Sequence, residues 1–106
     1  MSTDGAPPKT FGLDYDGTWS ADPEAFRAIA TMLRSRGHRV LLITARMSGH
    51  GEVLRECERH VDRVMFSGAH YKRALAQLHG ESVDIWIDDN PEMIGSDIPM
   101  AGDAPE

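Results

Sequence analysis

Short apolar runs alternate along this chain with stretches in which apolar residues recur every three or four positions. The runs predict strands, and the periodic stretches predict the helices between them. Strands are predicted over residues 9–13, 39–43, 63–66 and 83–87, and helices over residues 23–36, 52–60 and 69–78. Strands and helices that alternate in this way predict an α/β fold: a doubly wound parallel sheet with helices on both faces, in three layers.

The helix predicted over residues 23–36 has the clearest boundaries. Asp22 is a typical N-cap, Pro23 suits the first helical position, and Gly37 provides a stop. The helix over residues 69–78 is expected to turn Ala74, Leu75 and Leu78 inward. Residues 39–43 are almost continuously apolar, which predicts a strand that is buried on both faces.

Length and composition limit the kinds of protein that this chain can be. It has 106 residues, 17 acidic against 11 basic side chains and a net charge of −6, which indicates one small acidic domain. We expect a packed part over residues 9–100 and flexible ends at residues 1–8 and 101–106. The acid excess argues against a protein that binds nucleic acid mainly by neutralising phosphates.

The single cysteine and the lack of long apolar runs bear on location. Cys57 has no internal partner for a disulfide, which is typical of a reducing compartment. The chain shows neither a signal peptide nor an apolar run of the roughly 18 residues that a membrane span requires. We therefore expect a cytoplasmic protein with no membrane partner.

Polar side chains follow each predicted strand. In doubly wound sheets, ligands bind at the carboxyl ends of the strands. The residues at these ends are Asp14 and Asp16, Thr44 and Arg46, Ser67, and Asp88 and Asp89. Four carboxylates at one edge repel one another unless a cation lies among them. Oxygen ligands with room for water and a phosphate suit Mg²⁺, which is the expected cofactor.

Four short motifs carry a resemblance to a known family. Residues 11–18, FGLDYDGT, resemble the first motif of the haloacid dehalogenase superfamily, in which hydrophobic residues precede D-x-D-G-T. Residues 41–44, LLIT, are similar to the second motif, Lys72 to the third, and residues 85–89, IWIDD, to the fourth. The motifs follow the order of the family. The loops TAR (residues 44–46) and DDNP (residues 88–91) resemble those of small phosphatases of the polynucleotide 3′-phosphatase and nucleotidase kind.

The resemblance implies a phosphoric monoester hydrolase. Asp14 would be the nucleophile and form an aspartyl phosphate. Asp16 would act first as general acid and then as general base, while its backbone carbonyl would complete the metal shell. Family members that are dehalogenases lack an acid at the position of Asp16, so this chain is more similar to the phosphatases.

The other motif residues would support the phosphate and the metal. Thr44 would hydrogen-bond a phosphoryl oxygen, and Lys72 would balance the charge of nucleophile and phosphate. Asp89 is the preferred Mg²⁺ ligand, direct or through water, with Asp88 in support. The metal residues are thus Asp14, Asp16, Asp88 and Asp89.

Three further residues are candidates for substrate contacts. Arg46 and His50 lie in the loop after Thr44, where each is either a substrate contact or a solvated loop residue. Trp19 follows the nucleophile turn and either packs in the core or stacks on the substrate.

The chain has no room for a cap domain. Only residues 19–21 separate the first motif from the following helix, and only residues 67–71 separate the third strand from Lys72. Uncapped family members tend to act on large substrates or to use a neighbouring subunit as a lid. We therefore expect a bulky phosphomonoester, such as a nucleotide or a polynucleotide end, or a homo-oligomer that covers its own site.

Two other functions remain open at this point. A receiver-like signalling module also gathers acids, a Thr and a Lys around Mg²⁺, but it accepts phosphate on an Asp after the third strand, where this chain has Ser67. A non-catalytic binding protein with the haloacid dehalogenase fold would not need to keep Asp14, Asp16 and Lys72 together.

Overall fold

The computed structural model describes residues 7–47 and 54–95. The strands are β1 (Thr10–Leu13), β2 (Arg39–Thr44), β3 (Arg63–Phe66) and β4 (Ile85–Ile87), and the helices are α1 (Pro23–Ser35), α2 (Arg55–Glu58) and α3 (Lys72–Leu78). Two 3₁₀ turns, η1 (Trp19–Ala21) and η4 (Pro91–Met93), follow β1 and β4. The predicted flexible ends lie almost entirely outside the described residues.

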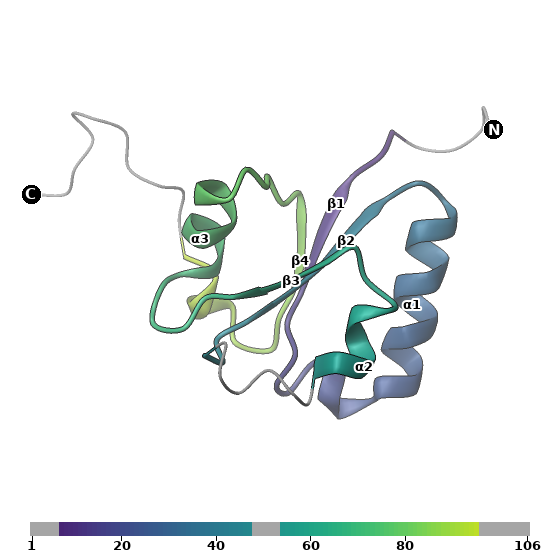
Figure 1. Ribbon diagram of the computed structural model, residues 1–106, viewed down its shortest axis with the longest axis horizontal. Coiled ribbons are helices and arrows are strands. Elements are labelled where there is room, and N and C mark those ends of the chain that lie inside the picture. Colours follow the sequence, from purple (N-terminus) through teal and green to yellow (C-terminus); the bar gives the residue numbers. More distant parts are fainter. Residues whose placement is uncertain (1–6, 48–53, 96–106) are drawn as a thin grey trace, which may run out of the picture.

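The four strands form one parallel sheet in the order β3-β2-β1-β4 (Figure 1). In its register, Phe11 of β1 lies opposite Val40 of β2 on one side and Ile85 of β4 on the other. The α/β prediction is confirmed, and the strand order is consistent with a Rossmann-like fold. Parallel pairing brings the carboxyl ends of all four strands to one edge.

Helices cover both faces of the sheet because β2 is apolar on both sides. Val40 and Leu42 pack in one core cluster with residues of α1 and α2, whereas Leu41 and Ile43 pack in a second cluster with Ala76 of α3. Side chains alternate between the two faces of a strand, so a continuous apolar run supplies both clusters. Figure 1 shows α1 and α2 on one side of the sheet and α3 on the other.

The structure confirms the boundaries predicted for α1. The Asp22 carboxylate accepts a hydrogen bond from Ala25 N at 3.2 Å and so caps the helix. At the other end, Gly37 has a φ of +92°, and His38 N donates to Leu33 O at 3.0 Å. Both features are typical of a helix that ends at a glycine.

The predictions for α3 and β4 need correction. Helix α3 begins at Lys72 rather than at Ala69, and Leu78, which was expected to face inward, is 71% exposed. Ala76 is the buried apolar residue of this helix, and Leu78 lies two positions, or about 200°, further round. Strand β4 has three residues, so it is shorter than the predicted range.

A buried carboxylate ties β2 and β3 together at the amino ends of the strands. Glu81 accepts hydrogen bonds from Arg39, at 3.0 Å and 2.7 Å, and from Arg63 at 2.9 Å. The hydrogen bonds from Arg39 lower the pKa of the Glu81 carboxyl, burial opposes them, and Arg63 lowers the pKa further. These contacts lie at the opposite edge of the sheet from Asp14.

Replacing Glu81 with Gln is expected to lower the free energy of unfolding by about 2 kcal/mol at pH 7, because two guanidinium groups lose their carboxylate. The lowered pKa means that the contribution of Glu81 is present at neutral pH. It disappears as the pH falls below the ordinary glutamate pKa of about 4.3. Urea denaturation at pH 7 and pH 3 measures both values. If the free energies of unfolding of the wild type and Glu81→Gln differ by as much at pH 3 as at pH 7, the role given to the Glu81 carboxylate is wrong.

The described residues include no helix that has both the length and the apolar composition to cross a membrane.

Candidate active site

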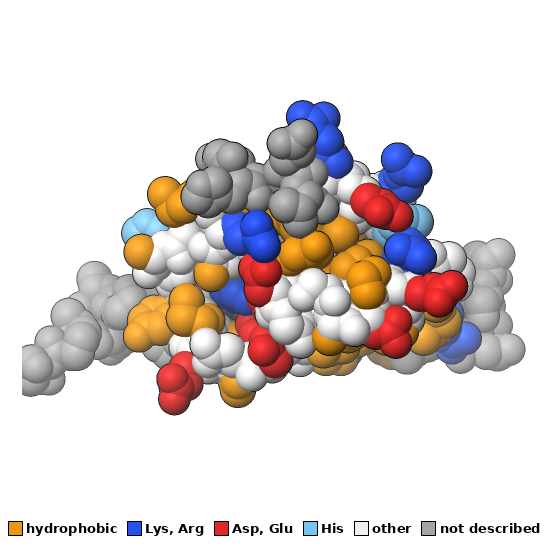
Figure 2. Space-filling view, turned by 90° about the horizontal axis from the view of Figure 1, so that it is seen from below, with side chains coloured by type: hydrophobic (Ala, Val, Ile, Leu, Met, Phe, Trp, Pro, Cys, Tyr) orange, Lys and Arg blue, Asp and Glu red, His pale blue; other side chains and the backbone are white. Residues whose placement is uncertain are grey.

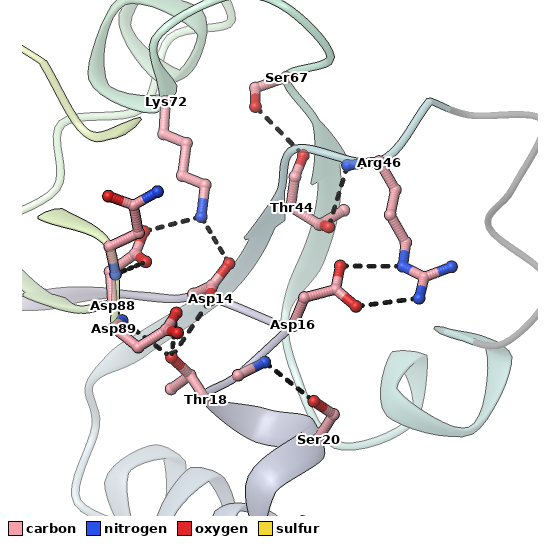
Figure 3. Close-up of polar contacts among 12 residues, drawn as sticks. Asp14, Asp16, Thr18, Ser20, Thr44, Arg46, Ser67, Lys72, Asp88 and Asp89 are labelled. Carbon is pink, nitrogen blue, oxygen red and sulfur yellow. Dashed lines mark hydrogen bonds and ion pairs between the residues drawn. The ribbon is translucent and has the colours of Figure 1, made fainter. Parts of the chain in front are cut away.

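Asp14 lies at the carboxyl end of β1, at the centre of the site (Figure 3). Its backbone N donates to Ile87 O at 3.0 Å, and its backbone O accepts from Trp19 N at 3.2 Å. The chain is thereby held on both sides of Asp14, by β4 and by η1. The side chain is buried, so its carboxylate depends on protein groups rather than on water for its partners.

Lys72 is the principal partner of Asp14. Its Nζ lies 2.6 Å from Asp14 Oδ1 and 2.7 Å from Asp88 Oδ2, and the residue is only 2% exposed. Lysine is rarely buried, because removing an ammonium group from water costs several kcal/mol unless anions surround it. The two carboxylates supply this compensation for the Lys72 ammonium group.

Burial raises the pKa of Asp14 to about 6, although Lys72 acts to lower it. A hydrogen bond with Asp89 and the charge of Asp88 add to the increase. The ionised form of Asp14 is therefore less stable in this site than in water. A bound divalent cation would remove that disadvantage.

Replacing Asp14 with Asn is expected to raise the melting temperature of the metal-free protein at pH 8, because the variant carries no disfavoured carboxylate. The raised pKa gives the sign: the folded wild-type protein binds a proton more tightly than the unfolded chain, so it loses stability as the pH rises from about 4 to 6. The difference in melting temperature between Asp14→Asn and the wild type should therefore become smaller towards pH 4. Thermal unfolding in chelator measures it, and a variant that melts below the wild type at pH 8 contradicts the expectation.

Three carboxylates form a cluster that is suited to a metal ion. Asp14, Asp88 and Asp89 each offer an oxygen, and these oxygens lie within 4.8 Å of one another. Asp88 already uses Oδ2 for Lys72 and accepts from Asn90 N at 2.9 Å through Oδ1. Asp89 is the exposed member, which makes it the more available metal ligand. Oxygen donors of this kind fit Mg²⁺, although they do not distinguish it from other hard cations.

Thr18 also belongs to this site, and the sequence analysis gave it no role. Its hydroxyl lies 3.2 Å from Asp14 Oδ2 and 3.5 Å from Asp89 Oδ1, and it accepts from Asp89 N at 3.1 Å. It therefore links the strand end of β1 with that of β4. The sequence did contain a signal for Thr18, because it is the last residue of the D-x-D-G-T motif. The turn within the motif allows its side chain to contact Asp14, the first residue.

The side chain of Asp16 does not join the other carboxylates, which corrects the expectation that four acidic side chains gather. Its two oxygens instead accept from Arg46 Nε and Nη2 at 3.0 Å and 2.9 Å, and it is exposed. A two-pronged guanidinium contact is favourable, whereas a fourth carboxylate near Asp14 would be repelled. The predicted roles of the Asp16 backbone carbonyl and of Arg46 as a substrate contact stay predictions.

Thr44 lies at the end of β2 and is fully buried. Its hydroxyl accepts from Arg46 N at 3.2 Å, and its backbone O accepts from Ser67 N at 2.7 Å and from Ser67 Oγ at 3.2 Å. In the described part of the chain the Thr44 hydroxyl accepts this one hydrogen bond, and its expected contact with a phosphoryl oxygen stays a prediction.

The structure favours one of the two roles expected for Trp19. The ring is 2% exposed and packs in the core with Phe26, at 6.1 Å between ring centroids. A ring this deeply buried presents no face on which a substrate could stack. His50 lies outside the described residues.

Figure 2 views the edge of the sheet that holds these residues. Acidic side chains are gathered at its centre, with basic side chains close by and exposed apolar side chains beside them. Of the site residues, Asp16 and Asp89 are exposed, whereas Asp14, Lys72 and Thr44 are buried. The intervals at η1 and at residues 67–71 are as short as the sequence indicated.

Gly17 keeps the space beside Asp89 open. It has a φ of +83°, and a Cβ added there would overlap the Asp89 carboxylate, only 2.7 Å from its Cγ. Gly37 is a matched control, because its φ is +92° and a Cβ meets nothing within 4 Å in the described part of the chain.

Replacing either glycine with Ala is expected to cost about 1 kcal/mol of stability, because both need a positive φ. Only Gly17→Ala should also weaken Mg²⁺ binding, by about tenfold or more, since it displaces Asp89. Titration of Mg²⁺ followed by melting temperature tests this. Equal metal affinity in the two variants contradicts the role given to Gly17.

Comparison with family models, with curated proteins and with solved structures finds no match for this chain. Function is therefore inferred from the residues and their geometry.

Proposed function

We propose that this protein is a Mg²⁺-dependent phosphomonoester hydrolase with a haloacid dehalogenase-like core, and that Asp14 is its nucleophile. The observation that carries the proposal is the buried contact between Lys72 and Asp14, beside Asp88 and Asp89. A cation held against a carboxylate in this way suits a group that must stay ionised and must receive a negatively charged phosphate.

The first step transfers the phosphoryl group to the protein. A carboxylate oxygen of Asp14 attacks phosphorus, the bond from phosphorus to the ester oxygen breaks, and Asp16 donates a proton to that oxygen. The alcohol leaves, and an aspartyl phosphate remains on Asp14. Because Asp16 is exposed and its two oxygens accept from Arg46, this step requires its side chain to leave Arg46, take up a proton from solvent and rotate towards the leaving oxygen.

The second step regenerates Asp14. Asp16, now ionised, takes a proton from a water molecule whose oxygen attacks phosphorus. The bond from phosphorus to the Asp14 carboxylate oxygen breaks, and inorganic phosphate leaves. Lys72 and the hydroxyl of Thr44 hold phosphoryl oxygens in both steps. Asp14 and Asp89 would hold Mg²⁺, with Asp88 in support, and the cation would neutralise charge on the phosphate when bound.

The alternative of a receiver-like module is less well supported. A receiver carries its phosphate on an Asp after the third strand, whereas Ser67 occupies that place and donates to Thr44 O through its hydroxyl. Asp16 would also hasten loss of the phosphate, which a signalling module must retain.

The absence of room for a cap also enters the proposal. The substrate is expected to be a nucleotide, a polynucleotide end or another bulky phosphomonoester, unless a second subunit covers the site. Gel filtration together with a substrate screen separates the two cases, since a monomer that hydrolyses only small phosphates supports neither.

The direct test is a phosphatase assay with purified protein. We expect 4-nitrophenyl phosphate to be hydrolysed in Mg²⁺, and we expect chelator to abolish the activity and added Mg²⁺ to restore it. If a screen of phosphorylated compounds with Mg²⁺ yields no release of phosphate, the proposed function is wrong.

A further inference from the structure

A hollow of about 350 Å³ lies between the loops that follow β2 and β3. It is lined by Met47, Phe66, Ser67, Gly68, Ala69 and His70. None of these residues belongs to the reaction scheme above. Among the described residues that line the hollow, none carries a carboxylate, an ammonium or a guanidinium group, although the adjoining site is strongly charged.

The hollow adjoins the candidate site at the carboxyl ends of β2 and β3. Ser67, part of its wall, is bonded to Thr44 O through both its backbone N and its hydroxyl. Met47 directly follows Arg46, which holds Asp16. Asp16, which is to protonate the leaving oxygen, lies against Arg46 on the side of this loop, so an organic group directed towards the loop would come to the hollow.

The chemistry of the walls favours a flat, uncharged ring. Of the lining residues, Met47 carries a thioether and His70 an imidazole, and Phe66 packs its ring against the neighbouring core cluster. Sulfur and aromatic groups contact rings favourably. Met47 is 60% exposed, so a ligand here would bury apolar surface that now faces water.

Gly68 preserves the shape of the hollow. It has a φ of +57°, and a Cβ at this position would lie 3.1 Å from Met47 Sδ. An alanine here would require the sulfur of Met47 to shift slightly, in addition to the strain of a positive φ. Gly68 thus allows the positive φ of the turn and leaves room for the Met47 side chain.

We propose that this hollow, the Met47 hollow, binds an aromatic leaving group and makes the enzyme selective for phosphomonoesters of flat, uncharged rings. The proposal rests on the phosphatase function above and adds the substrate class. The ring could be an aryl group or a nucleobase, because the walls offer the same contacts to both.

The test compares benzyl phosphate with ethyl phosphate, because both leaving groups are simple alcohols and differ mainly in the ring. We expect wild-type kcat/KM to be at least tenfold higher for benzyl phosphate, chiefly through a lower KM. Met47→Ala should reduce the benzyl-to-ethyl ratio about tenfold, and Ala69→Trp, which fills the hollow, should reduce it further. Met32→Ala is the matched control, since Met32 is a similarly exposed methionine on α1, at 49%, and should leave the ratio unchanged.

The outcomes separate this proposal from the proposed function. If both esters are hydrolysed in an Asp14-dependent way but the ratio is near one, or is unchanged in Met47→Ala, the Met47 hollow is not a leaving-group site and the phosphatase function stands. If neither ester is hydrolysed, nor any other phosphomonoester, both proposals fail.

A third substrate, adenosine 3′-monophosphate, identifies the source of the ring. Hydrolysis that weakens in Met47→Ala supports a nucleobase in the hollow. If only benzyl phosphate is hydrolysed, and its hydrolysis weakens in Met47→Ala, the hollow binds an aryl group.

Discussion

Asp14→Asn is expected to lower kcat for phosphomonoester hydrolysis by roughly 10⁴-fold or more, with little change in fold. An amide is a poor nucleophile towards phosphorus, so the aspartyl phosphate cannot form. The amide has nearly the same shape as the carboxylate and can still accept from Lys72 Nζ, which now lies 2.6 Å from Asp14 Oδ1. Steady-state release of phosphate measures the loss.

Asp16→Asn gives the complementary result and separates the two acids. With 4-nitrophenyl phosphate, whose leaving group needs no proton, phosphoryl transfer to Asp14 should continue, but attack by water should slow. The aspartyl phosphate should therefore accumulate and be visible by mass spectrometry after rapid acid quench. No such species is expected in Asp14→Asn.

Asp22→Asn is the control for these two substitutions. Asp22 caps α1 outside the site, and Asn is an equally good cap, so activity should be unchanged. Activity of Asp14→Asn at the wild-type level would overturn the assignment of the nucleophile. A phosphoenzyme that still forms in Asp14→Asn would place the phosphate on another residue.

Lys72→Met is expected to cost about 3–5 kcal/mol of stability in the absence of metal. The substitution leaves the carboxylates of Asp14 and Asp88 close together without the ammonium group that each of them contacts. Activity should fall by roughly 10²–10³-fold, because a group that stabilises phosphoryl charge is lost. Urea denaturation in chelator and phosphatase assays on the folded fraction measure the two effects.

The double variant Lys72→Met with Asp88→Asn separates charge from packing. Removing one of the two unpaired carboxylates should restore more than half of the stability that Lys72→Met loses, whereas activity should stay low. Mg²⁺ should also stabilise Lys72→Met more than it stabilises the wild type, because the cation takes over part of the charge balance. If Lys72→Met is as stable as the wild type, the ammonium group does not balance the carboxylates as described.

Local patterns in the sequence were sufficient for much of the fold. The apolar run of β2, the cap at Asp22 and the stop at Gly37 act within a few residues, so their outcome does not depend on distant parts of the chain. The end of α3 shows the limit of such patterns. Leu78 repeats at a helical spacing, but the helix ends there, and no element within residues 7–47 and 54–95 covers it.

The candidate site was predictable to the extent that it follows from strand ends. Parallel strands bring their carboxyl ends to one edge, and this is why Asp14, Thr44 and Asp88 could be placed together before the structure was known. The position of Lys72 was predictable for a similar reason, because it is the first residue of α3, the helix that follows β3. Their identity as a metal and phosphate site came from the resemblance of the motifs and remains a proposal.

The sequence by itself determined the elements of this protein, their order and the residues that stand at one edge of the sheet, because hydrophobic periodicity and turn residues act locally. Only the tertiary structure decided which side chains meet there. Asp16 pairs with Arg46, 30 positions away, and Thr18 meets Asp89 across 71 positions. Such pairs result from competition among charges and hydrogen-bond groups that folding brings together, and this competition depends on burial and distance in space rather than on spacing along the chain.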